Sequence, residues 1–229
     1  MNTVNDPTEM IPRVVYDRGE IERLRWFQLE RYCSAGLVKS IPARLAFDPF
    51  DSQSTYFGVY KGDDIVATAR IVQADAPEIL RYHDLHPETL ARLQRHRDCV
   101  AEVSRLAVSQ DSEPYRALRL LSREFLRFGA QSAEGLLLLA SVERPLVRIL
   151  DRLLGVPVDV VGPSLAQYGD YPGETVPILI DTINCIEVFS ANTERQSSFF
   201  MEDLKLDVRE PQFRRSDIPY AEAFFCASV

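Results

Sequence analysis

The chain has 229 residues, of which 46% are hydrophobic and 26% charged, and its formal net charge is −8. This composition is that of an ordinary globular protein. The acidic balance argues against a general binder of nucleic acids or anionic membranes, because such proteins carry an excess of Lys and Arg. No apolar run approaches the ~20 residues of a membrane span. We therefore expect a cytoplasmic protein with no nucleic-acid partner and no transmembrane segment.

The cysteines and histidines suggest no metal or disulfide site. The four cysteines are scattered without a CxxC pair, which favours free thiols in a reducing compartment: Cys33, Cys99, Cys185 and Cys226. The three histidines lack the spacing of metal ligands. Two of them, His83 and His86, fall in a loop before a predicted helix, where we expect surface residues.

Hydrophobic periodicity in the first half of the chain predicts a helix and then a β-hairpin. Residues 20–32 have the apolar spacing of an amphipathic helix, and Gly36 stands where it should end. Residues 55–60 and 65–72 are rich in aromatic and β-branched side chains, and Gly62 lies in the turn between them.

The second half alternates helices with strands. Pro87 and Pro114 suit the first turns of helices at 87–97 and 114–131. A further helix at 143–154 precedes Gly155, and strands are predicted at 100–108, 135–141, 156–161 and 176–180. The order predicts an α/β (α+β) fold with a mixed central sheet flanked by helices. We expect one domain over 1–183 and a C-terminal extension over 184–229 that packs on it.

Ionisable residues stand inside the otherwise apolar strand 100–108. Alternation should place Glu102 and Ser104 on one face, with Val103 and Arg105 on the other. Buried charges need partners. The candidates are Asp48 and Asp51 for an arginine, and Arg25 or Arg70 for a carboxylate. One interpretation is an ion-pair network that only holds a loop on the sheet.

The other interpretation is catalytic. Acyl transfer to an amine requires a base to take the amine's proton and donors to stabilise the oxyanion. Glu102, on a central strand, is placed to be that base, and free backbone N–H groups where the sheet splays can be the donors. Asp48 and Asp51 would suit a cationic or amino-bearing acceptor.

Several motifs, in order, resemble those of acyl-homoserine-lactone (LuxI-type) synthases, and more closely their exosortase-associated and N-acyl amino acid synthase relatives, which share the GNAT fold. The resemblance covers about residues 24–181. Its motifs are Leu24-Arg25-Trp26, Asp48-Pro49-Phe50-Asp51, Ala67-Thr68-Ala69-Arg70 and Glu102-Val103-Ser104-Arg105, with 142–150 and 161–168 also in register.

The resemblance implies an N-acyltransferase with Glu102 as catalytic base. It further implies a charged lining that positions the acceptor, formed by Arg25, Asp48, Asp51, Arg70 and Arg105, with Ser141 near the acyl or acceptor pocket. Leu29 stands where homoserine-lactone synthases have Phe, and Trp26 is the only Trp. Because those synthases use aromatics to hold S-adenosylmethionine, an amino acid is at least as good a candidate for the acceptor.

The donor is expected to be an acyl-phosphopantetheine thioester on acyl carrier protein, with acyl-CoA as the alternative and no tightly bound cofactor. Residues 109–114 lack the glycines that usually cradle a coenzyme A pyrophosphate, and Pro114 removes a donor. Arginines at helical spacing form two stripes that suit an acidic carrier or merely a solvated face: Arg116, Arg119, Arg123 and Arg127, then Arg144, Arg148 and Arg152. An acetyl-CoA-dependent acetyltransferase and a non-catalytic acyl-binding module remain as further alternatives.

Overall fold

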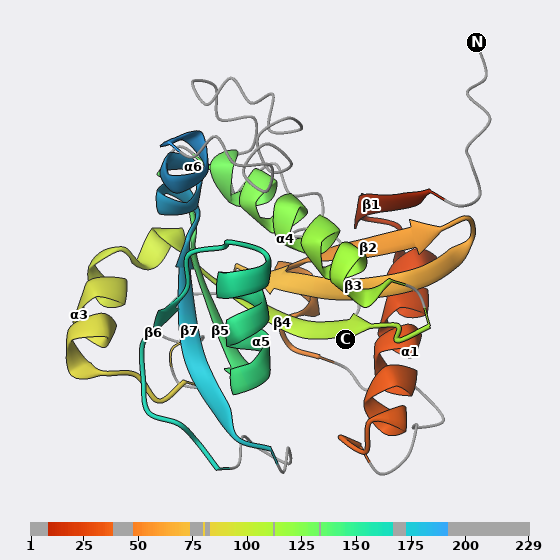
Figure 1. The fold of residues 1–229 in the computed structure, drawn as a ribbon, viewed down its shortest axis with the longest axis horizontal. Helices are drawn as coiled ribbons and strands as arrows, with labels where there is room; N and C mark the ends of the chain where they lie inside the picture. The colour runs from red at the N-terminus through yellow and green to blue at the C-terminus, as the bar shows by residue number, and fades with distance from the viewer. Residues whose placement is uncertain are drawn as a thin grey trace, which may run out of the picture.

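The structure, a computed structural model, describes residues 9–38, 48–73, 80, 83–111, 113–132, 134–166 and 173–191. Within these ranges the chain forms a seven-stranded sheet with the order β1-β2-β3-β4-β5-β7-β6 (Figure 1). The strands are β1 Met10–Val15, β2 Ser54–Lys61, β3 Asp64–Val72, β4 Val100–Val108, β5 Leu137–Glu143, β6 Asp159–Val160 and β7 Thr175–Asp181. All neighbours are antiparallel except β4 and β5.

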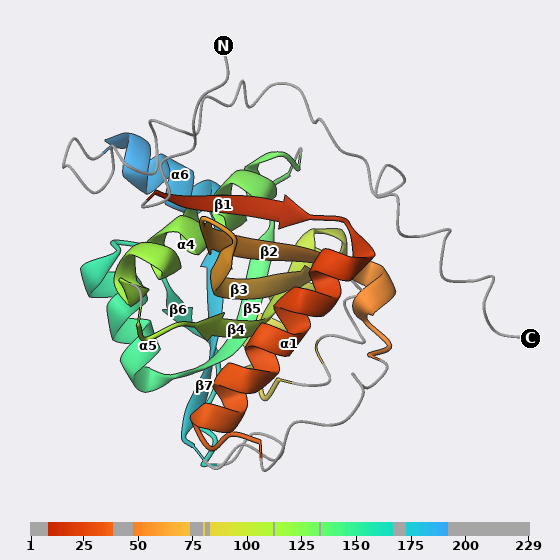
Figure 2. The same ribbon diagram turned by 90° about the vertical axis from the view of Figure 1, so that its right-hand side faces the viewer.

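Helices cover both faces of this sheet (Figure 2). The helices α1 (Arg18–Ser34) and α3 (Pro87–Arg95) lie on one face. The other face carries α4 (Pro114–Ala130), α5 (Arg144–Arg148) and α6 (Thr182–Ala191). The mixed sheet with flanking helices confirms the predicted fold class.

Strand alternation divides the core between the two faces. Phe57, which is fully buried, points to the α4 face and meets the Phe125 ring edge-on at 5.2 Å. Its neighbour Tyr56 points the other way and packs with the buried Leu24 of α1. Because β2 is buried on both faces, the run 54–60 shows no polar alternation.

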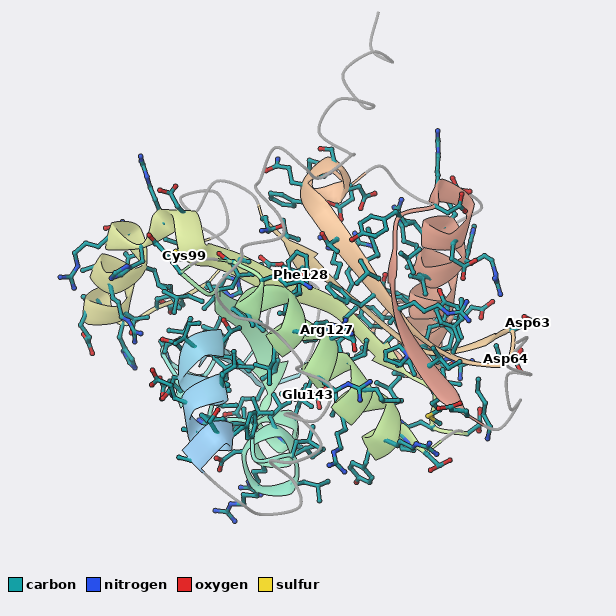
Figure 3. All side chains as sticks on the ribbon, turned by 90° about the horizontal axis from the view of Figure 1, so that it is seen from above. Asp63, Asp64, Cys99, Arg127, Phe128 and Glu143 are labelled. Carbon is teal, nitrogen blue, oxygen red and sulfur yellow. The ribbon has the colours of Figure 1, made fainter. Side chains whose placement is uncertain are left out.

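The predicted hairpin is confirmed as β2 and β3. Gly62 has φ 61°, a left-handed conformation that glycine adopts without steric cost, and it forms the tight turn. Asp63 and Asp64 lie at this tip, at the opposite end of the molecule from Cys99 (Figure 3). The hairpin therefore extends the sheet away from the α3 side of the fold.

Most of the other predicted elements are confirmed, with shifted ends. The strand 100–108 is β4 as predicted, whereas 135–141 is shifted to Leu137–Glu143. The helix 143–154 is α5 followed by a π-helical turn at Ile149–Leu153. The strand predicted at 156–161 is reduced to Asp159–Val160, and β1 was not predicted.

The helix α6 was also not predicted, and it spans the expected domain boundary at 183/184. Its Cys185 and Phe189 are buried against β5 and β7 residues such as Ile178. The remainder of the expected C-terminal extension, 192–229, lies outside the described residues. Of the four cysteines, the three that the structure describes are free: Cys33, Cys99 and Cys185. None of the described helices is long and apolar enough to cross a membrane.

Candidate active site

The sheet splits beside Glu102. β4 pairs with β5 only from Val100 to Glu102, opposite Leu137–Leu139. Beyond that point β4 continues along β3, whereas β5 continues along β7 to Glu143, and the two strands diverge (Figure 1). Residues 102–106 are partly exposed although they lie in the middle of the sheet. On the β5 side, the backbone N–H groups of β4 beyond Glu102 are therefore not paired with β5, and an oxyanion site requires such donors.

Glu102 is the last β4 residue that pairs with β5, and its side chain is 16% exposed. The expectation that Arg25 or Arg70 would pair with it is wrong, because both arginines bind aspartates. Its partner is His83, whose Nε2 lies 3.4 Å from Glu102 Oε2.

His83 was expected at the surface, yet its side chain is only 1% exposed. Its Nδ1 lies 2.9 Å from the Ser141 hydroxyl on β5. Leu139 lies opposite Glu102 in the parallel ladder, and Ser141 follows Leu139 by two residues. The Ser141 and Glu102 side chains therefore project from the same face of the sheet. The structure thus brings together one predicted acceptor residue, the predicted base and a histidine that sequence reasoning missed.

The position of His83 depends on a glycine far along the chain. The Gly162 Cα lies so close to the loop that a Cβ would sit 1.9 Å from the Asp84 carbonyl oxygen. The His86 N–H also donates to the Val161 carbonyl at 2.9 Å. Only glycine permits this backbone approach, which seats the loop carrying His83 against the segment after β6.

The remaining predicted acceptor residues form one connected ion-pair network. Arg70 bridges the two aspartates, with Nη1 2.8 Å from Asp48 and 3.3 Å from Asp51. Arg25 binds the other Asp51 oxygen at 2.9 Å, and Arg105 binds Asp48. The prediction that Asp48 and Asp51 partner the arginines is therefore confirmed.

Neighbouring groups fix the protonation and orientation of this network. Burial alone would raise the pKa of Asp48, but the Arg70 and Arg105 guanidiniums and the Phe50 N–H outweigh it and hold that pKa below its ordinary value. The Tyr56 hydroxyl donates to Asp51 at 2.6 Å, and burial together with Asp51 raises the pKa of Tyr56 to about 12. Asp48 is thus a carboxylate at neutral pH, and the Tyr56 hydroxyl donates its hydrogen bond to Asp51.

The predicted orientation of Arg105 is wrong. Two β4 residues, Arg105 and Leu106, face one β3 residue between the Thr68–Ala107 and Arg70–Ser104 pairs, and Arg105 has φ 57°. This β-bulge turns Arg105 onto the face of Ser104. There its guanidinium reaches Asp48 and also donates to Gln28 of α1 at 3.3 Å.

The network has an excess of positive charge. Its three arginines face two aspartates, so its formal charge is +1. Arg105 is the most accessible of the three, with 27% side-chain exposure against 12% for Arg25 and 6% for Arg70. The accessible side of the network therefore favours an anionic group. No cluster of three or more candidate metal ligands occurs among the described residues.

The two arginine stripes differ in accessibility. On α4, Arg116 is exposed and pairs with Glu113 at 3.5 Å, whereas Arg123 is 12% exposed and lies 3.6 Å from Glu124. Arg119 is partly buried, and Arg127 is exposed on the same helix (Figure 3). The second stripe is exposed throughout: Arg144, Arg148 and Arg152.

These features together describe a GNAT-like fold with a carboxylate where the central sheet splits. The chain belongs to the FeeM family of N-acyl amino acid synthases, whose model matches residues 23–168. It is an N-acyltransferase of that family. No curated protein matches the chain in sequence.

Solved structures agree on the fold. The structure of FeeM, an N-acyl amino acid synthase from uncultured soil microbes, has a TM-score of 0.59 at 16% identity and covers 78% of this chain and 94% of its own. The acyl-homoserine-lactone synthase LasI has 0.54 at 16%, covering 76% and 91%. The CoA-dependent acyl-homoserine lactone synthase BjaI has 0.57 at 15%, covering 87% and 91%. At such identities the likeness shows the fold alone.

Proposed function

We propose that the protein transfers a fatty-acyl group from a phosphopantetheine thioester to the amine of an amino acid, with Glu102 as general base. The observation that carries this proposal is the placement of Glu102 where β4 leaves β5, beside backbone N–H groups that do not pair with β5. A carboxylate there can take the proton of an attacking amine while those N–H groups stabilise the oxyanion.

The charged network supports an amino acid as acceptor. Arg105 is its accessible cation, and an amino acid brings an α-carboxylate that a guanidinium binds in bidentate fashion. S-adenosylmethionine also carries an α-carboxylate, so this contact suits both acceptors. The FeeM family match and Leu29, which replaces an aromatic of the homoserine-lactone synthases, favour the amino acid.

The start of α4 favours acyl carrier protein over coenzyme A as the donor. Pro114 opens this helix without an N–H to donate, and Glu113 at the N-cap adds negative charge where a pyrophosphate would bind. A carrier protein presents only its phosphopantetheine arm there, and the exposed Arg144, Arg148 and Arg152 can meet its acidic surface. Acyl-CoA is the alternative donor, since BjaI is a CoA-dependent synthase.

Mass spectrometry tests the reaction and the acceptor together. Purified protein is supplied with a long-chain acyl carrier protein or acyl-CoA and a mixture of amino acids and S-adenosylmethionine. An N-acyl amino acid is the expected product, and an acyl-homoserine lactone would instead identify S-adenosylmethionine. No acylated amine from any pairing would contradict the proposal.

The base is tested by Glu102→Gln, which keeps the side-chain size but removes the proton acceptor. The expected loss in rate is about 10²–10⁴-fold, the usual range for a general base. Glu88→Gln is the matched control, because Glu88 is exposed on α3, and it should retain the wild-type rate. A wild-type rate for Glu102→Gln would contradict the assignment of Glu102 as the general base.

A further inference from the structure

Ser141, His83 and Glu102 form a continuous chain of polar contacts across the split in the sheet. The Ser141 hydroxyl lies 2.9 Å from His83 Nδ1, and His83 Nε2 lies 3.4 Å from the Glu102 carboxylate. They come from three separate segments: β5, the loop before α3, and β4. A buried imidazole between a carboxylate and a hydroxyl can pass a proton between them, because its two nitrogens exchange donor and acceptor roles with the tautomer.

The proposed reaction leaves a proton to be moved. An acceptor amine enters as R–NH₃⁺ and ends as an amide N–H, so two protons leave the nitrogen. The thioester R′CO–SR″ becomes R′CO–NHR, and the departing sulfur takes up one proton as HS–R″. One proton therefore goes to solvent and one is needed at sulfur, whereas Glu102 alone can hold only one at a time.

We propose that His83 and Ser141 carry this second proton from Glu102 to the leaving sulfur. The C–N bond forms as Glu102 takes the nitrogen's proton, and Glu102 then passes it to His83 Nε2. The Nδ1 proton moves to the Ser141 oxygen, and the Ser141 hydroxyl gives its own proton to sulfur as the C–S bond breaks and leaves its electron pair there. The imidazole returns to its starting tautomer through its two neighbours, because a solvent proton reaches Nδ1 by way of the partly exposed Ser141 while the Nε2 proton leaves by way of Glu102.

The surroundings of His83 suit a relay rather than a solvated loop. Its side chain is 1% exposed, whereas His86, on the same loop, is exposed. The backbone approach of Gly162 to Asp84 holds the loop in place. Ser141 is only partly buried, so its hydroxyl can face a donor that enters between β4 and β5. This inference rests on the proposed acyl transfer and adds the residues that serve its leaving group.

Leaving-group dependence tests the relay directly. The rates of His83→Gln and Ser141→Ala are measured with two thioesters of the same fatty acid, one of N-acetylcysteamine and one of thiophenol. The acceptor is the one that yields product in the mass-spectrometric assay described above. Both variants should lose about 10²-fold with the alkyl thioester, the lower end of the range for acid–base groups. With the aryl thioester the loss should fall to about tenfold or less, because a more acidic thiol leaves without a proton.

Glu102→Gln and His86→Gln complete the comparison. Glu102→Gln should stay strongly impaired with both donors, since its first task is at nitrogen whichever thiol leaves, and His86→Gln should match wild type with both. If Glu102→Gln is impaired but His83→Gln and Ser141→Ala lose equally with both donors, the relay is refuted while the proposed function survives. A covalent acyl adduct on Ser141 in the mass spectrum of the intact protein would also overturn the relay. Should His83→Gln not fold, Ser141→Ala supports the same comparison.

Discussion

Asp48→Asn removes one negative charge from the buried network without changing the side-chain shape. The Asp48 side chain is 8% exposed and contacts both Arg70 and Arg105. After the change, Asp51 is the one carboxylate left in the network, and it contacts Arg25 and Arg70 but not Arg105. The substitution therefore tests whether the contacts of Asp48 with Arg70 and Arg105 contribute to the free energy of unfolding.

The expected cost is about 3 kcal/mol in the free energy of unfolding. Opposite charges at the 2.8 Å of the Asp48–Arg70 contact attract by ~6 kcal/mol at an effective dielectric of ~20. Desolvation offsets part of this, and breaking one side of a buried pair typically costs about 3–5 kcal/mol. The lower end applies because Arg70 keeps Asp51 at 3.3 Å and Ser104 at 2.9 Å.

The pH dependence of this cost has a definite sign. The folded-state pKa of Asp48 lies below its ordinary value of 3.8, so the native state favours the charged form. The stabilisation is fully present above 3.8 and is lost as the pH falls through the folded-state value. The difference between Asp48→Asn and wild type should be constant from about pH 7 to pH 5 and shrink below about pH 4.

Urea unfolding followed by circular dichroism at several pH values measures this difference. Asp98→Asn is the control, because its contact with Arg97 is long, at 4.0 Å, and its side chain is 83% exposed. The control should change stability by no more than about 0.5 kcal/mol. A loss below about 1 kcal/mol for Asp48→Asn at neutral pH would refute the reasoning, since exposed pairs contribute that little.

Two further substitutions test the supports of the site. Gly162→Ala should force the Asp84 backbone to move, since a Cβ would lie 1.9 Å from its carbonyl oxygen. It should therefore lower activity at least as much as His83→Gln. Gly36→Ala is the comparison, because its added methyl group meets open space and its φ of 73° leaves backbone strain as the only cost. Tyr56→Phe should cost about 1.5–3 kcal/mol in urea unfolding, because it removes a 2.6 Å hydrogen bond to the charged Asp51. Wild-type activity for the first, or wild-type stability for the second, would contradict these assignments.

The sequence pattern was sufficient for most of the sheet and for the grouping of the charged residues. Strand β4 was predicted with its observed ends, because nine residues of mixed apolar character precede a proline-started helix. The pairing of Asp48 and Asp51 with arginines followed from the cost of burying unpaired charge. Strand β1 was missed because Pro12 and Arg13 interrupt its apolar pattern, and edge strands tolerate such residues.

His83 could not be placed from local sequence. Its burial depends on contacts with residues 19 and 58 positions away along the chain, and its loop is held by Gly162. A signal was present in the Gly162-Pro163 pair, since a glycine after an apolar segment can mark a close approach of two backbones. That signal indicates that another backbone segment packs against Gly162, and only the tertiary structure shows that this segment is the loop of His83.

The bulge at Arg105 links the fold to the chemistry. Strict alternation would point Arg105 away from Glu102 and Ser104, and would leave Asp48 with Arg70 alone. One extra residue in β4 turns the guanidinium onto the α1 face and helps β4 bend away from β5 just beyond Glu102. The irregularity that strand periodicity cannot predict thus lies where the sheet opens beside the proposed base, and it supplies the accessible cation that we propose for an acceptor carboxylate. A non-glycine residue held at positive φ costs free energy, and here that strain lies within the site whose geometry depends on it.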